Sequence, residues 1–263
     1  MKKISVLIAI LAVALPALAQ DIKDYGAVPF MNITTNARWA GMGDAGAVSV
    51  VETTSVFDNP AAISFYNARG GAGITFMPWQ SNIANKSSLT ALSGMFRIDE
   101  DNSVSLGMRL LTGPESFTGD NIRLRPYDFD LSLAYASKLS RNISVSATAH
   151  YIHSRIGIVD DRRIDADGFA FDVGAFYAQP VHSLKGASWK LGLRVANLGP
   201  DLKYQHISPG DHTGSNSLPG KAVFGGSVFL PFTPDHKILL AGDIGYQFMP
   251  TGSVDAGLGV EYT

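Results

Sequence analysis

The chain has 263 residues, no cysteine and a formal net charge of −2 at pH 7. The lack of cysteine excludes disulfides and thiolate metal sites, and the lack of a basic surplus leaves no electrostatic basis for binding nucleic acid. A chain of this length forms one large β domain or two ordinary domains.

The first residues have the three parts of a secretory signal peptide. A positive start, "MKK", precedes the apolar run "ISVLIAILAVAL", and Ala17–Ala19 form a small-residue cleavage site before Gln20. The run is shorter than the ~20 apolar residues of a membrane-spanning helix. We therefore predict that residues 1–19 are a signal peptide and that the mature chain works outside the bacterial cytoplasm.

Residues 20–70 are rich in Gly, Ala, Asn and Thr and show no strand periodicity. Gly41, Gly43 and Gly46 satisfy G-x-G-x-x-G, the spacing of a dinucleotide-binding loop. That fingerprint also needs a buried strand before it, a helix after it and an acidic residue about 20 positions on. The flanking residues fit neither element, and Tyr66 occupies the acidic position. We predict no cofactor and expect the glycines to allow close backbone packing in a confined space.

From residue 71 onward, apolar and polar residues alternate, which is typical of strands with one apolar and one polar face. In "NISVSATAHYI", for example, Ile143, Val145 and Ala147 alternate with Ser144 and Ser146. Ten such segments are predicted, near residues 71–79, 88–98, 103–111, 127–138, 143–154, 168–179, 188–197, 222–231, 237–248 and 253–262.

The connections between these segments alternate in length, as in a transmembrane β-barrel. The segments have about the 9–11 residues that tilted membrane strands need, whereas strands of a soluble β-sandwich, the alternative fold, run about 5–6 residues. Tight turns are predicted at 99–102, 140–142 and 233–235, and long polar loops at 112–126, 155–167 and 198–221.

Charged residues lie in mid-strand on the polar face, which suits a water-filled lumen better than the core of a sandwich. We expect mainly structural charge pairing among them, with selectivity for a solute as the alternative. They are Arg109, Asp130, Asp172, Lys190, Arg194 and Asp243.

Two motifs of the N-terminal segment resemble the signature of FadL-type outer-membrane barrels. They are "NARWAGMGDAG" and, further on, "DNPAAISF". Together with the preceding "VPF" and the following "GITFMPW", in this order, they resemble the PorV/PorQ family of Bacteroidota, and its PorV branch most. The signature residues are Arg38, Gly41, Met42, Gly43, Gly46, Asn59, Pro60 and Ala61.

The resemblance implies an all-β fold, a transmembrane antiparallel β-barrel of FadL type formed by residues 71–263, with residues 20–70 as a plug in its lumen. It implies a place in the bacterial outer membrane, in contact with lipid and lipopolysaccharide, and a role in the type IX secretion system. There, cargo leaving the translocon is bound by its C-terminal signal domain and shuttled to the sortase-type attachment complex. No catalytic residue is implied. Ten strands are fewer than the family barrel has, so we expect a chain truncated before its last strands.

Three further stretches contain residues of the types found in metal sites or recognition loops. His150 and His153 form H-x-x-H, but residues i and i+3 of a strand point to opposite faces and do not chelate one metal ion. The stretch 160–168, "DDRRIDADG", lacks the spacing of a calcium loop and is predicted to be a solvated loop, with a weak cation or lipopolysaccharide contact as the alternative. Residues 208–220 suit a surface recognition loop.

Two other functions remain open beside cargo binding. A FadL-type transporter of hydrophobic small molecules would need an apolar pocket against the plug, and a lipid hydrolase in the barrel wall would need a Ser and a His on one outward face. The sequence offers no convincing pair for the hydrolase. The residues proposed for the apolar pocket are Phe30, Met31, Trp39, Met42 and Phe57.

Overall fold

The computed structural model describes residues 26–78, 87–117, 122–159, 162–181, 183–204 and 216–263. The predicted signal peptide, residues 1–19, lies outside the described residues, as do residues 208–215 of the predicted recognition loop. In the described part, no helix combines the length and the apolar character needed to cross a bilayer.

One antiparallel sheet makes up most of the molecule, which confirms the all-β prediction. Its strands follow the chain order from β1 to β11, except that the short β4 pairs only with β5. The strands are β1 (Gly70–Pro78), β2 (Ser88–Arg97), β3 (Asn102–Thr112), β4 (Ser116–Phe117), β5 (Ile122–Lys138), β6 (Ile143–Val159), β7 (Arg162–Pro180), β8 (Ser188–Leu198), β9 (Lys221–Thr233), β10 (His236–Gln247) and β11 (Ser253–Tyr262).

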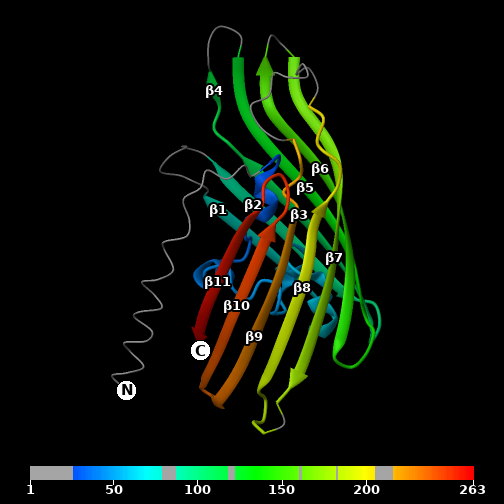
Figure 1. Cartoon of the computed structure of the whole chain (residues 1–263), viewed down its shortest axis with the longest axis vertical. Coiled ribbons are helices and arrows are strands. Elements are labelled where there is room, and N and C mark those ends of the chain that lie inside the picture. The colour runs from blue at the N-terminus through cyan, green and yellow to red at the C-terminus, as the bar shows by residue number, and fades with distance from the viewer. Residues whose placement is uncertain (1–25, 79–86, 118–121, 160–161, 182, 205–215) are drawn as a thin grey trace, which may run out of the picture.

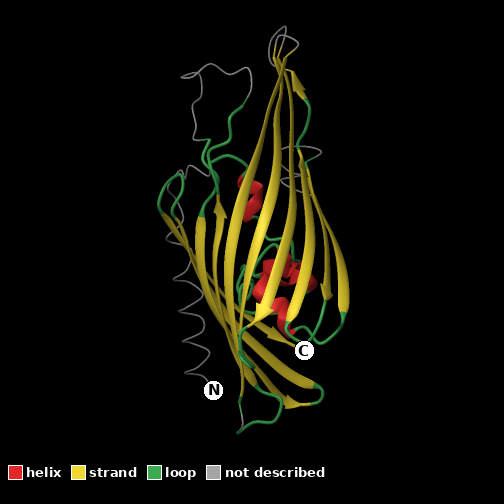
Figure 2. Ribbon diagram, turned by 90° about the vertical axis from the view of Figure 1, so that its right-hand side faces the viewer, coloured by secondary structure: helices red, strands yellow, loops and turns green. Residues whose placement is uncertain are grey.

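The sheet curves around the N-terminal segment, residues 26–69, which we call the plug (Figures 1 and 2). The plug contains four short helices of one or two turns, drawn in red inside the curve in Figure 2. They are η2 (Pro29–Asn32), α2 (Ala37–Gly41), η3 (Thr53–Val56) and η4 (Pro60–Phe65).

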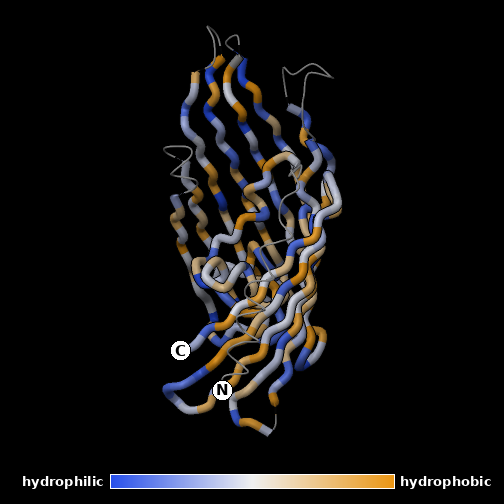
Figure 3. Tube along the Cα trace, turned by 60° about the vertical axis from the view of Figure 1, so that its left-hand side comes forward, coloured by the Kyte–Doolittle hydropathy of each residue, from blue (hydrophilic) through white to orange (hydrophobic). Residues whose placement is uncertain are grey.

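The polar face of the sheet is its inner face. On β5, Asp130 and Ser132 are fully buried, whereas Leu131 and Leu133 between and after them are 39% and 59% exposed. Figure 3 shows the same alternation of hydropathy along neighbouring strands. An apolar outer surface around a polar interior is the arrangement of a membrane barrel and the reverse of a soluble protein.

The tight turns predicted at 99–102, 140–142 and 233–235 join the ends of the strands that point downward in Figure 1. In the turn after β2, the Asp99 carboxylate accepts the backbone N–H groups of Asp101 (2.9 Å) and Asn102 (2.8 Å). A side-chain oxygen that accepts from N–H groups two and three residues on is the usual reason for Asp at the start of such a turn.

The predicted loops 112–126 and 155–167 are wrong in part. The structure adds β4 within the first, and β5, β6 and β7 extend through most of the rest, so the stretch predicted as a solvated loop is strand from Arg162 onward. Register shifts lie between Leu124 and Tyr127 and between Arg155 and Gly157. A bulge breaks the period-two pattern, which is why these extensions are not visible as alternation in the sequence.

Candidate functional site: the plug and the inner wall

The glycine-rich stretch of the plug forms a short helix followed by tight turns. Asn36 caps α2, because its side-chain oxygen accepts the backbone N–H of Arg38 at 2.9 Å. Gly43 and Gly46 have φ angles of +67° and +96°, which favour glycine. A Cβ atom on Gly46 would also lie 3.3 Å from the ring of Trp39. The backbone at Gly43 and Gly46 therefore favours glycine, and Gly46 is also closely packed, as predicted, whereas Gly41 has nothing within 4 Å of an added Cβ atom and is not required by packing.

Arg38 connects the plug to the last strand. Its Nε donates to Glu261 of β11 at 2.7 Å, and its guanidinium also pairs with Glu52 of the plug. The guanidinium lies 4.9 Å from the centre of the Trp39 ring. This signature residue thus fixes the plug to the wall at one side of the lumen.

The N-P-A motif fixes the plug at another side. The side chain of Asn59 donates to the carbonyl oxygens of Val48 and Ala175, both at 3.0 Å. Pro60 and Ala61 begin η4, and the hydroxyl of Ser144 on β6 donates to the Ala61 carbonyl at 2.6 Å. The motif therefore connects two plug segments with β6 and β7.

Glycines of the wall provide the clearance for this packing. A Cβ atom on Gly192 would lie 1.8 Å from the Val48 carbonyl oxygen, one on Gly257 would lie 2.3 Å from the Gly43 carbonyl oxygen, and one on Gly107 would lie 2.5 Å from the Phe57 ring. Such separations are too short for any side chain. The inner wall therefore packs so closely against the plug that a single added methyl group at these glycines would overlap plug atoms.

Five buried charged or titratable side chains cross the inner wall in one line, which we call the ionic row: Arg109, Asp130, His150, Asp172 and Arg194. Arg109 Nη2 donates to Asp130 Oδ2 at 2.7 Å, and Arg194 Nε donates to Asp172 Oδ2 at 3.1 Å. His150 lies between the two carboxylates, with Nδ1 2.9 Å from Asp130 and Nε2 3.1 Å from Asp172. The row joins β3, β5, β6, β7 and β8, and it confirms the predicted charge pairing for its arginines and aspartates.

The ionic row also holds the plug. Arg109 Nη1 donates to the Met31 carbonyl oxygen at 2.7 Å, and its guanidinium lies 4.9 Å from the centre of the Phe57 ring. At the other end of the row, Asn197 donates its backbone N–H to Asp172 and its side-chain amide to Asn32 of the plug at 3.1 Å. Charges that are buried and fully paired keep these contacts in one geometry.

The other two charged residues predicted for the lumen lie outside the ionic row. Asp243 on β10 faces the plug, with Oδ2 3.4 Å from the backbone nitrogen of Val48. Lys190 on β8 lines a separate pocket with Phe65 and Tyr66 of the plug. Asp243 shares the lining of one cavity with Arg194, whereas Lys190 lies at a pocket that none of the other grouped charges lines.

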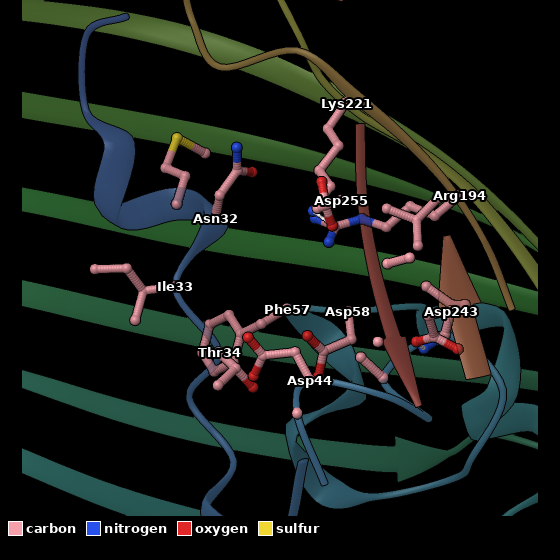
Figure 4. Close-up of a pocket in the computed structure, with 17 residues that line it drawn as sticks. Asn32, Ile33, Thr34, Asp44, Phe57, Asp58, Arg194, Lys221, Asp243 and Asp255 are labelled. Carbon is pink, nitrogen blue, oxygen red and sulfur yellow. Dashed lines mark hydrogen bonds and ion pairs between the residues drawn. The ribbon is translucent and has the colours of Figure 1, made fainter. Parts of the chain in front are cut away.

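A cavity of about 180 Å³ with both charged and apolar lining residues, the plug cavity, lies between the plug and strands β8–β11 (Figure 4). Asp44 and Asp58 of the plug and Asp243 of β10 line it, with Arg194, Lys221 and Asp255 on the wall. The oxygens Thr34 Oγ1, Asp58 Oδ2 and Asp243 Oδ1 are buried without a hydrogen-bond partner among the described residues. Burial raises the pKa of Asp58 to about 7, against the opposing effect of Arg194 and Arg109.

The residues predicted to form one apolar pocket are all buried but lie in three separate clusters. Phe30 and Met31 pack with Leu202 and Leu218, which lie in the connection between β8 and β9. Trp39 and Met42 pack against β10, and Phe57 packs with Val56 against β2 and β5. Met31 and Phe57 also line the plug cavity, whose other lining residues are divided about evenly between polar and apolar.

Sequence reasoning missed Asp44, Asp58 and Asn197 as partners in the lumen. No periodicity marks the two aspartates, because the plug is irregular, and Asn197 has a φ of +58° that the sequence does not reveal. His150 points inward and His153 outward, as predicted. Among the described residues, no group of three or more His, Asp or Glu is placed to hold a metal ion.

Comparison with known proteins gives one family and several distant structures. The family model described as type IX secretion system protein PorV matches residues 19–254. No curated protein matches the sequence. The CymD monoaromatic hydrocarbon channel is 14% identical over 84% of this chain and 74% of its own, with a TM-score of 0.49. The Pseudomonas putida toluene transporter TodX is 11% identical over 94% of this chain and 91% of its own, with a TM-score of 0.43.

Proposed function

Because the chain belongs to the PorV family of type IX secretion system proteins, we propose that it is a non-enzymatic cargo-binding protein of the outer membrane. In this proposal it binds secreted proteins by their C-terminal signal domain as they leave the translocon. It then passes them to the sortase-type attachment complex at the cell surface. The observation that carries the proposal is the family match, which extends over residues 19–254.

The packing of the lumen supports a function at the surface over passage through the lumen. The plug is bonded to the wall at Arg38, Asn59 and Arg109, and wall glycines leave no room for side chains between the two. A solute crossing the lumen would need to break several of these contacts at once. The parts of the molecule that remain accessible to a protein partner are the outer rim and the ends of the strands.

Transport of hydrophobic small molecules, the second hypothesis, calls for an apolar pocket beside the plug. The cavity found there is lined by Asp44, Asp58 and Asp243 as well as by Arg194 and Lys221. Burying an apolar ligand against these groups would remove water from charges that it does not replace with hydrogen bonds. The chemistry of the cavity therefore favours cargo binding over hydrocarbon transport.

The proposal is tested by deleting the gene and by direct binding. The deletion strain is expected to lose surface attachment of secreted proteins that carry the C-terminal signal domain, and the purified full chain is expected to bind that domain. A secreted protein without the domain is the matched control in both assays. Normal attachment in the deletion strain, with loss only of uptake of a hydrophobic compound, would establish the transport hypothesis instead.

A further inference from the structure

Three neighbouring strands extend far beyond the rest of the sheet. Strands β5, β6 and β7 have 17, 17 and 19 residues, whereas β8 has 11. In Figure 1 their upper ends rise past those of β8 to β11. At a rise of about 3.3 Å per residue, the extension stands well clear of the neighbouring strands on the side of the long loops.

Along one edge of this extension, β7 pairs with no strand in the part of the chain that the structure describes. Pairing between β7 and β8 begins at Phe171, so Arg162–Ala170 pair with β6 only, and no other described strand lies along their free side. The cause lies in β8, where Asn197 takes a φ of +58° and donates its N–H to the Asp172 side chain. After β8 the chain turns inward, and Leu202 packs against Ala166 and Ala170 on the inner face of β7.

The free edge presents regular hydrogen-bonding groups. The N–H of Ala178 donates to Asn142, which shows that even-numbered residues of β7 face β6. A Cβ atom on Gly199 would meet the carbonyl oxygen of Phe169, which shows that odd-numbered residues face the other side. By this alternation, Arg163, Asp165 and Asp167 direct their backbone groups toward the open edge. On β7 itself the stretch contains no proline and no extra residue, and the bulge in its ladder with β6 adds its residue to β6, between Arg155 and Gly157.

The position of the edge suits a water-soluble partner. Tyr151 and Phe169 pack together on the outer face at 5.6 Å between ring centres, as aromatic residues do at a membrane interface. The free edge lies beyond them, where the outward side chains are Arg163, Asp165 and Asp167. An open edge inside the hydrocarbon layer would be heavily penalised, whereas outside that layer water can hydrogen-bond to the edge until a strand displaces it.

We infer that the edge of β7 at Arg163–Asp167 is the docking site for an extended strand of the cargo's C-terminal signal domain, which adds to the sheet by backbone hydrogen bonds. This inference rests on the proposed cargo-binding function and names its site. Because backbone hydrogen bonds do not depend on side-chain identity, such a site would accept cargo strands of different sequence. The alternating charges of Arg163 and Asp165 favour an incoming strand that carries an acidic residue opposite the arginine.

The test compares Asp165→Pro with Asp165→Ala in the purified full chain. Proline removes the edge N–H and blocks a close strand, while the pairing of β7 with β6 stays intact because Asp165 does not face β6. Alanine removes the same carboxylate and keeps the N–H. Affinity for the signal domain is expected to fall at least tenfold in the proline variant and to change less than threefold in the alanine variant. Equal affinity of the two variants would overturn the inference.

A second measurement needs no variant. Hydrogen exchange at the amides of Arg163, Asp165 and Asp167 is expected to slow when the signal domain binds the unmodified chain, whereas amides that face β6 change little. Binding without slower exchange at these amides would overturn the inference and leave the proposed function standing. No binding at all would overturn the proposed function itself. Since the chain has no cysteine, an Asp165→Cys variant also reports a second copy at the edge, and a crosslinked homodimer would replace the cargo strand as the occupant.

Discussion

The ionic row and the plug cavity lie in the same lumen, but their charges are compensated differently. In the row, each arginine is hydrogen-bonded to an aspartate, and all five residues are buried. Among the groups that line the cavity, Arg194 pairs with Asp172 of the row and Lys221 pairs with Asp255, whereas Asp44 and Asp58 have no ion pair among the described residues. The row therefore fixes the geometry of the plug through Arg109, while the buried Asp58 of the cavity makes the stability of the protein depend on pH.

The largest effect is expected from breaking the ionic row. Replacing Arg109 with methionine leaves Asp130 buried without its main partner and removes the bond to Met31. Loss of one partner of a buried pair costs about 3–5 kcal/mol, and we expect a decrease of that size in the free energy of unfolding by urea. Arg123→Ala is the control, because the Arg123–Glu115 pair lies at the exposed end of β5. Equal losses in both variants would show that burial of the row adds nothing.

The next effect tests the clearance between wall and plug. A methyl group at Gly192 would overlap the Val48 carbonyl, whereas Gly94, on the outer face of β2, has nothing within 4 Å of the same position. We expect Gly192→Ala to destabilise the protein by about 1–3 kcal/mol, as overpacking does, and to make the plug more sensitive to protease. Gly94→Ala is expected to leave both properties unchanged. An intact, resistant plug in Gly192→Ala would contradict the close packing described for the lumen.

The pH dependence of stability tests the cavity. The pKa of Asp58 is raised from its ordinary value of 3.8 to about 7 in the folded protein, so between these values the native state binds the proton more tightly than the unfolded state. Stability therefore falls as pH rises from about 4 to about 7, by up to ~1.4 kcal/mol per pH unit from this group. Asp58→Asn is expected to remove that contribution.

The measurement is the urea midpoint of both proteins at several pH values. The variant is expected to become more stable relative to the unmodified protein as pH rises through this window. Identical pH profiles would show that the pKa of Asp58 does not differ between the folded and the unfolded protein.

The smallest effect is expected at the open side of the cavity. Lys221 Nζ lies 2.9 Å from Asp255, whose side chain is 52% exposed. An exposed pair contributes about 0–1 kcal/mol and is weakened by salt. Lys221→Ala is therefore expected to lower the free energy of unfolding by less than about 1 kcal/mol, and raising the ionic strength should shrink the difference. A loss as large as that of Arg109→Met would contradict the distinction between the two regions.

Particular residues show how far the sequence was informative. Arg109 and Asp130 were grouped from their place on the polar face, and they are direct cross-strand partners in the register of β3 and β5. Lys190 and Asp243 come from the same pattern, but neither joins the ionic row: Asp243 meets Arg194 only across the plug cavity, and Lys190 lies at a separate pocket. Face is encoded within each strand, whereas pairing depends on which strands are neighbours and in what register.

By itself, the sequence determined the fold class, the polar inner face and the presence of an irregular glycine-rich segment before the strands. These properties follow from period-two alternation and from glycine, both of which act over a few residues. Only the tertiary structure decided that His150 lies between two carboxylates and which glycines contact the plug. It also decided where, among the described strands, β7 has an unpaired edge. Those features arise from register, bulges and the turn at Asn197, which bring together residues far apart in the chain.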